Sequence, residues 1–275
     1  MQVRDGDKET YLYINGLKVL RPIQLGNNIE LLPATGKYDP NYALKHIKND
    51  IDMGIIILFM CSIYSQIKIK NSNPKELVIQ AWNTQWDIVF LNALFDNNII
   101  CNIQSNKSYE DIKSEDCNIS ITNYHLHGLS NKIFTLKEKD AKWIEINICR
   151  ARDLQKNDKF LNAIHCLASY KWHTLPRAQL AIIWAGIEGL FEIESEISFR
   201  ISLYISNFLE KNKKKREDMF KNIKNLYNYR SDAVHGSKMK GNAAEIVNSS
   251  AILLRKIIIK CINDNAIPNK NALLF

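Results

Sequence analysis

The stretch TLPRAQLAIIWAGIEGLFE, residues 174–192, decides how the second half of the chain folds. Thr174 and Pro176 form a helix start, because proline at the first helical position has no N–H group to leave unpaired. Apolar residues then recur at intervals of three and four, at Leu180, Ile183, Trp184, Ile187, Leu190 and Phe191. This spacing is the period of a helix with one apolar face. The stretch therefore predicts a helix that packs against others through that face.

The same spacing recurs before and after this stretch. We expect helices over residues 160–172, from Ile197 to Phe208, from Met219 to Arg230 and over residues 242–262. The short connections between them predict an antiparallel bundle. The one dense charge run, KNKKKR at residues 211–216, is interpreted as a solvated loop between two helices in preference to a nucleic-acid contact.

Before residue 150 the apolar residues come in short runs broken by turn signals. Asn15-Gly16 between two apolar runs predicts a β-hairpin, and residues 26–28, Gly-Asn-Asn, predict a second one. A helix is expected over residues 73–95, with Asn73 as its N-cap and Pro74 at its first position. Short strands are expected at residues 99–103, 117–122 and 143–148. The fold class is therefore α+β, with a mixed α/β domain of unassigned role over residues 1–150 and an all-α antiparallel bundle over residues 151–275.

Composition and charge suit a chain that works inside the cell on a polyanion. Lys and Arg number 37 against 29 Asp and Glu, and the net charge of +8 fits a partner such as nucleic acid. A codon bias toward Lys, Asn and Ile explains the charge equally well. Six scattered cysteines without a CxxC pair and a polar N-terminus favour a reducing cytoplasm. The longest apolar stretch, residues 54–64, is too short to cross a membrane, so we expect no membrane partner and a buried strand or helix.

Common catalytic signatures are absent from the sequence, which contains no GxGxxG, P-loop, GxSxG, HExxH or paired-cysteine zinc pattern. His125 and His127 are interpreted as part of a polar turn rather than as metal ligands. His165 is interpreted as a satisfied or half-exposed helix residue, and Trp82 and Trp86 as core rather than as a platform for bases. We therefore expect neither a metal nor a cofactor.

The stretch YNYRSDAVHG, residues 227–236, contains an arginine and a histidine that could carry chemistry. Arg230 follows the apolar stripe of Ile223 and Tyr227, where a charge is costly unless it has a partner or opens onto a cleft. His235 precedes Gly236, which predicts a helix end there. The spacing alone is a weak motif, and a snorkelling arginine beside a capping histidine explains it as well as a functional pair does.

Such a pair suits the cleavage of RNA. Arginine grips a phosphate through its planar fork, and histidine moves protons near neutral pH. RNA supplies its own nucleophile, the 2′-hydroxyl, so neither a metal nor a protein nucleophile is needed. DNA lacks that hydroxyl, and one arginine with one histidine would be a poor catalyst for it.

Three segments together resemble a known family. LYNYRSDAVHG at residues 226–236, preceded by WAGIEGLFE at 184–192 and FRISLYISNFLE at 199–210, is similar to the Apea-like branch of the HEPN superfamily. The similarity covers residues 155–262. It implies a HEPN helical bundle that forms a homodimer, in which two RX4-6H motifs face one cleft and act as a metal-independent ribonuclease. It also implies a setting in toxin or phage-defence systems, with an antitoxin or regulatory partner.

The resemblance also implies roles for particular residues. Arg230 and His235 match the catalytic pair, and the supporting positions match Ser231, Asp232, Tyr227, Glu188 and Arg200. The leading hypothesis is thus a cytoplasmic endoribonuclease. The alternatives are a noncatalytic HEPN module that binds RNA or a protein partner, and a purely structural helical protein. A titrating histidine is of little use to a binder, which favours the enzyme.

Overall fold

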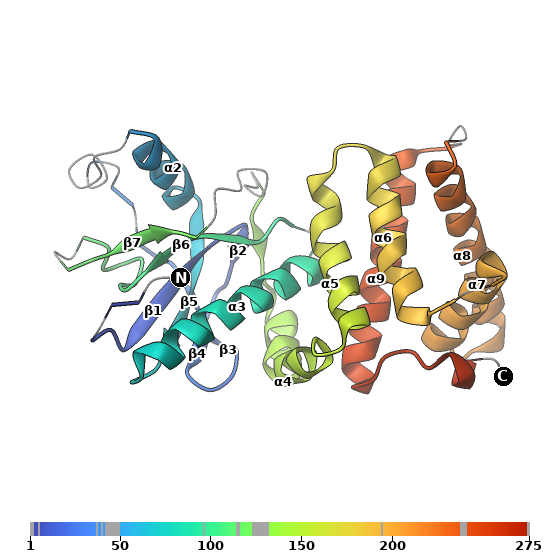
Figure 1. The fold of residues 1–275 in the computed structure, drawn as a ribbon, viewed down its shortest axis with the longest axis horizontal. Helices are drawn as coiled ribbons and strands as arrows, with labels where there is room; N and C mark the ends of the chain where they lie inside the picture. The colour runs from blue at the N-terminus through green and yellow to red at the C-terminus, as the bar shows by residue number, and fades with distance from the viewer. Residues whose placement is uncertain are drawn as a thin grey trace. The chain divides into compact units, whose positions relative to one another are not determined.

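The chain is a mixed α/β protein in which an N-terminal sheet is followed by a helical region (Figure 1). The structure is a computed structural model, and it describes residues 3–4, 6–36, 38–39, 41, 50–95, 97–113, 116–122, 132–193, 195–236 and 241–273. The chain divides into two compact units, Met1–Cys149 and Arg150–Phe275. Each unit has its own core.

The N-terminal unit is built on an antiparallel sheet in the order β3-β4-β5-β1-β6-β7. Its strands are β1 (Glu9–Asn15), β3 (Ile23–Gln24), β4 (Ile29–Pro33), β5 (Ile63–Lys70), β6 (Ile100–Ser105) and β7 (Ile119–Ile121). Strand β1 lies inside the sheet, with Leu12 opposite Ile67 of β5 and Gln104 of β6. The expected strands near residues 99–103 and 117–122 are confirmed as β6 and β7.

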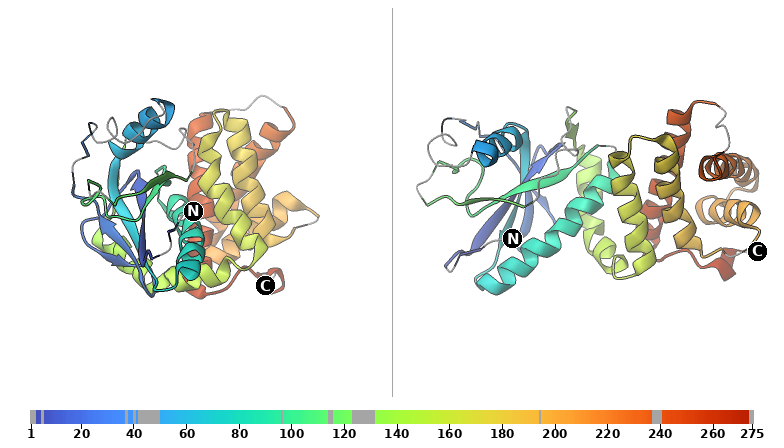
Figure 2. Two further views of the ribbon diagram at one scale, coloured as in Figure 1. Left: turned by 60° about the vertical axis from the view of Figure 1, so that its left-hand side comes forward. Right: turned by 45° about the horizontal axis from the view of Figure 1, so that its top comes forward.

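Two helices cover opposite faces of this sheet (Figures 1 and 2). Helix α2 (Asp50–Met60) packs Phe59 and Met60 against Tyr11 and Tyr13 of β1. Side chains alternate along a strand, so Leu12 points to the other face, where α3 (Pro74–Leu94) contacts β1, β5 and β6. The apolar residues 54–64 thus end a helix and begin strand β5.

Helix α3 begins as its sequence predicts, but its two tryptophans lie outside the core. The Asn73 side chain accepts a hydrogen bond from the Lys75 N–H at 3.0 Å, and Pro74 is the first helical residue. The expectation that Trp82 and Trp86 are core is wrong, because their exposed fractions are 60% and 39%. The buried face carries polar residues as well as apolar ones, so apolar character alone does not mark the buried positions. They include Leu77, Ala81, Thr84, Asp87, Ile88 and Leu91.

The hairpin expected at Asn15-Gly16 is wrong, because β2 (Leu17–Lys18) does not fold back on β1. It pairs in parallel with β8 (Phe134–Thr135) in a separate two-stranded sheet. Gly16 has a φ of +80°, and a Cβ there would lie 1.9 Å from the carbonyl oxygen of Asn98. The glycine thus permits a close approach of two backbones. The second expected hairpin is confirmed, since Ile23 of β3 pairs with Leu31 of β4.

The strand expected at residues 143–148 is also wrong, because these residues lie inside helix α4 (Glu138–Leu154). Ala141, Ile144, Ile148 and Ala151 are buried at helical spacing, while Ile146 is 70% exposed. The short alternation of apolar and polar residues was compatible with a strand, but the longer helical period prevails.

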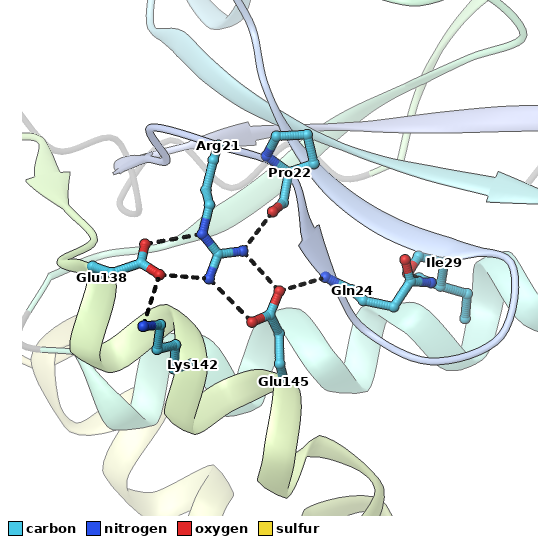
Figure 3. A network of polar contacts seen from close by, with 7 residues as sticks. All are labelled: Arg21, Pro22, Gln24, Ile29, Glu138, Lys142 and Glu145. Atoms are coloured by element: carbon cyan, nitrogen blue, oxygen red, sulfur yellow. Dashed lines mark hydrogen bonds and ion pairs between the residues drawn. The ribbon is translucent and has the colours of Figure 1, made fainter.

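Arg21 ties α4 to the turn before β3 (Figure 3). Its guanidinium donates to both carboxylate oxygens of Glu138, at 2.9 and 3.1 Å, and to both of Glu145, at 2.8 and 3.0 Å. A further bond of 2.8 Å goes to the Pro22 carbonyl oxygen. The Arg21 hydrogen bonds lower the pKa of both carboxyl groups.

The second unit is helical. Its helices are α5 (Asp158–Ser169), the 3-10 helix η2 (Tyr170–Trp172), α6 (Pro176–Phe191), α7 (Ile197–Leu209), α8 (Lys213–Val234), α9 (Ala243–Asp264) and the 3-10 helix η3 (Lys270–Leu273). Helix α6 packs against α5, α8 and α9. Its apolar stripe is buried as the sequence predicts, at Leu180, Ile183, Trp184, Ile187, Leu190 and Phe191.

The charge run at residues 211–216 and His165 both lie in this helical unit. The charge run at 211–216 is not a loop throughout, because α8 begins at Lys213 and the Asn212 side chain caps it by accepting from the Lys215 N–H at 3.1 Å. His165 is half-buried in α5, as expected, and burial lowers its pKa.

Within the described part of the chain, no helix is both long and apolar enough to span a membrane.

Candidate active site at the end of helix α8

Helix α8 ends where the sequence predicts, and His235 is its C-cap. The backbone N–H of His235 donates to the carbonyl oxygen of Ser231 at 3.0 Å. Gly236 follows with a φ of +77°, the left-handed conformation that commonly ends a helix. The His235 side chain is exposed at this end, so it is accessible to a ligand.

Arg230 is held by Glu188 of α6. Its Nε lies 3.0 Å from Glu188 Oε1, and its Nη2 donates to Oε2 at 3.1 Å. Both side chains are largely buried, with exposed fractions of 20% and 24%. Burial raises the pKa of Glu188, and the charge of Arg230 opposes that rise. The charge on the apolar face thus has the partner that its position requires.

Two aromatic residues support Arg230 from the core. The guanidinium carbon lies 5.5 Å from the centre of the Tyr227 ring. That ring meets Trp184 edge to face, with their centres 5.3 Å apart, and Trp184 Nε1 donates to Ser250 Oγ at 3.2 Å. Burial raises the pKa of Tyr227. A continuous series of contacts therefore runs from α9 through α6 to the arginine of α8.

Arg177 is a residue of this region that the sequence did not single out. Its Nη1 donates to the carbonyl oxygens of Asp232 and Ala233, at 3.1 and 3.0 Å. These bonds join the first turn of α6 to the last turn of α8, and Figure 1 shows both ends at the same side of the helical unit. A contact between residues 55 positions apart leaves no local pattern. The only sequence signal was the arginine directly after Pro176 at a helix start.

The other predicted site residues divide into two groups. Ser231 and Asp232 are half-buried on α8, and they bind His235 and Arg177 through their backbone carbonyls. Arg200 lies elsewhere, because its Nε pairs with Glu196 at 3.1 Å. It lines a separate cavity of about 180 Å³ together with Tyr204 and Lys270. The structure therefore brings Tyr227, Glu188 and Arg230 together, and it does not add Arg200 to them.

Among the described residues, no hydrogen bond or ion pair joins the side chains of Arg230 and His235. The guanidinium is turned back along α8 toward Tyr227 and Glu188, whereas His235 lies beyond the end of the helix. On an ideal helix, residues five apart differ by about 140° in direction and about 7.5 Å in height. No protein group in the described part of the chain accepts a hydrogen bond from Arg230 Nη1.

In the part of the chain that the structure describes, no group of three or more His, Cys, Asp or Glu side chains could hold a metal ion. His125 and His127 lie outside the described residues. Comparison of the chain with protein-family models, with curated proteins and with solved structures gave no match.

Proposed function

We propose that this chain is a metal-independent endoribonuclease of the HEPN type, which acts as a homodimer on RNA. The observation that carries the proposal is the end of α8, where Glu188 holds a largely buried Arg230 and the exposed His235 forms the C-cap. The sequence resemblance assigns the catalytic roles to these same two residues. A cytoplasmic toxin or phage-defence effector, with an antitoxin or regulatory partner, is the biological setting that the resemblance implies.

The chemistry follows from the two side chains. The 2′-hydroxyl of RNA loses its proton to a histidine and attacks the adjacent phosphorus, while the bond from phosphorus to the 5′-oxygen breaks. The leaving oxygen takes up a proton, which gives a 2′,3′-cyclic phosphate and a 5′-hydroxyl. Arg230 stabilises the negative charge that builds up on the phosphate oxygens. Two copies supply two histidines, one as base and one as acid.

Exposed apolar residues near this end support the homodimer. Leu175, the residue that precedes α6, is 68% exposed, and Val234, next to His235, is 48% exposed. Arg177 links these two segments, so the apolar side chains border the candidate site. Burial against a second copy would remove them from water and bring two α8 ends together.

A second function is favoured by one specific observation. The fork of Arg230 already binds a carboxylate, which is also what a structural arginine does. A noncatalytic HEPN module that binds RNA or a protein partner would keep this pair and would not depend on His235. The histidine therefore separates the two hypotheses.

The test is incubation of the purified protein with total cellular RNA in EDTA, followed by mapping of the cut ends. We expect cyclic phosphate and 5′-hydroxyl ends from the wild type and loss of cleavage in His235→Ala, with the variant still folded. His165→Gln, which changes a half-buried histidine of α5, is the matched control and should cleave normally. Full cleavage by His235→Ala would remove the catalytic assignment.

A further inference from the structure

We propose that Arg177 is a positioning residue of the candidate active site, which fixes the last turn of α8 and thereby the place of His235. This inference rests on the proposed function for its catalytic meaning. It rests on the hydrogen bonds of Arg177 for its structural part, and the two parts can be tested separately.

The bonds of Arg177 satisfy groups that a helix cannot satisfy itself. The last carbonyl oxygens of an α-helix have no intrahelical donor. At the end of α8, the Ser231 oxygen accepts from the His235 N–H, and the next two oxygens, of Asp232 and Ala233, accept from Arg177. A positive charge at the C-terminal end of a helix is also favourable for the helix dipole. Arg177 therefore caps α8 from a neighbouring helix.

Helix α6 holds α8 at three levels. Arg177 binds its last turn, Trp184 packs against Tyr227, and Glu188 pairs with Arg230. Because the Arg230 side chain runs back along the helix, its guanidinium is positioned by Tyr227, which Trp184 supports, and by Glu188. His235 lies beyond the contacts of Tyr227 and Arg230, and Arg177 of α6 binds the turn of α8 that carries His235. The relative positions of Arg230 and His235 in each copy thus depend on both ends of α6.

The first experiment measures hydrogen exchange in the folded full-length protein. We expect Arg177→Met to speed exchange of the backbone amides over residues 231–236 by about tenfold or more, because the freed carbonyls let the turn open. Exchange around Tyr227 should stay unchanged. Arg177→Lys should stay close to the wild type, since an ammonium can also donate to two carbonyl oxygens.

Lys214→Met is the matched control, because it removes an exposed charge at the opposite end of α8. It should leave exchange over residues 231–236 unchanged. If Arg177→Met fails to fold, Arg177→Gln gives the same comparison. Unchanged exchange over residues 231–236 in a folded Arg177→Met or Arg177→Gln would overturn the proposal.

The second experiment measures RNA cleavage. We expect Arg177→Met to lower kcat by about 10- to 100-fold, because a small misplacement of a catalytic group has an effect of this size. KM should change little, since Arg230 keeps its contacts, and Arg177→Lys should restore most of kcat. A raised KM with an unchanged kcat would show instead that Arg177 binds substrate, which contradicts positioning. If the wild type cleaves no RNA, the proposed function fails, while the exchange experiment still decides the role of Arg177.

Discussion

Two arginines, one in each unit, bind glutamates in different ways. Arg21 uses all five of its N–H donors, four on Glu138 and Glu145 and one on a backbone carbonyl (Figure 3). Arg230 engages one carboxylate, that of Glu188, through Nε and Nη2. The first arginine is saturated by its own unit, whereas no described residue accepts from Nη1 of the second. The number of satisfied donors, rather than the presence of an ion pair, is what separates these two arginines.

The largest expected effect comes from replacing the guanidinium of Arg230 by an ammonium, with the same replacement at Arg21 as the control. Arg230→Lys should lower RNA cleavage by about 100- to 1,000-fold, because lysine cannot bind Glu188 and a phosphate through one planar group. Arg21→Lys should cleave at the wild-type rate. Initial rates on one RNA substrate, measured with folded proteins, check both. Similar losses in the two variants would show that the difference in donor use has no functional meaning.

A smaller effect is expected from the packing of α6 against α5 at Gly186. A Cβ at Gly186 would lie 2.9 Å from Cys166 Cβ and 3.3 Å from Ala163 Cα, so Gly186→Ala should destabilise the helical unit by about 1–3 kcal/mol. Gly189 is the matched control, because its nearest neighbour would be 3.5 Å away. Gly189→Ala should stabilise by about 0.5–1 kcal/mol through helix propensity.

Urea unfolding of the two glycine variants measures this difference. A Gly186→Ala protein as stable as Gly189→Ala would mean that α6 can move away from α5 without cost. In that case the placement of Glu188, and with it that of Arg230, would be less firmly fixed than the contacts of Gly186 indicate.

The smallest effect is a difference in pH dependence between the two glutamates. The pKa of Glu145 is lowered by Arg21, so its contribution to stability is present above the unfolded pKa and is lost as the pH falls through the folded one. The pKa of Glu188 is raised by burial, against the opposing charge of Arg230. Its contribution is present below the unfolded pKa, near 4.5, and is lost as the pH rises through the folded one.

Glu145→Gln and Glu188→Gln should therefore change the pH dependence of stability in opposite directions. Relative to the wild type, Glu145→Gln should lose less stability when the pH falls from 7 to 4, and Glu188→Gln should gain less. Unfolding free energies of the three proteins at both pH values give the comparison. The same direction of change in both variants would contradict the contrast between the two sites.

Local signals predicted much of the fold and failed where distant segments meet. The Asn73 cap, the turn after Gly26 and the buried stripe of α6 depend on neighbours within a few residues, and all three are confirmed. Gly16 has the same local sequence as a hairpin turn, but it serves an approach to Asn98, which is 82 positions away. Residues 143–148 alternate like a strand, and only their place in a longer helix decides against it.

The candidate site was predictable to a similar extent. The position of Arg230 on an apolar stripe required a partner, and the resemblance placed Glu188 among the supporting residues. The apolar pattern could not reveal Arg177, because its acceptors are backbone carbonyls that any residue possesses. Arg200 matched a charged family position, but its own neighbour Glu196 binds it. Side-chain pairing across helices depends on how the helices pack, and the spacing of residues in the sequence does not predict it.

The burial of Trp184 has an optical consequence. Its ring is fully buried and contacts Tyr227, which in turn contacts Arg230, whereas Trp82 of the other unit and Trp172 of η2 are 60% and 46% exposed. Of the five tryptophans in the sequence, Trp184 therefore has an apolar environment close to Arg230. A change in fluorescence at short emission wavelengths, abolished in Trp184→Phe, would report movement of the helix that carries Arg230 without any added label.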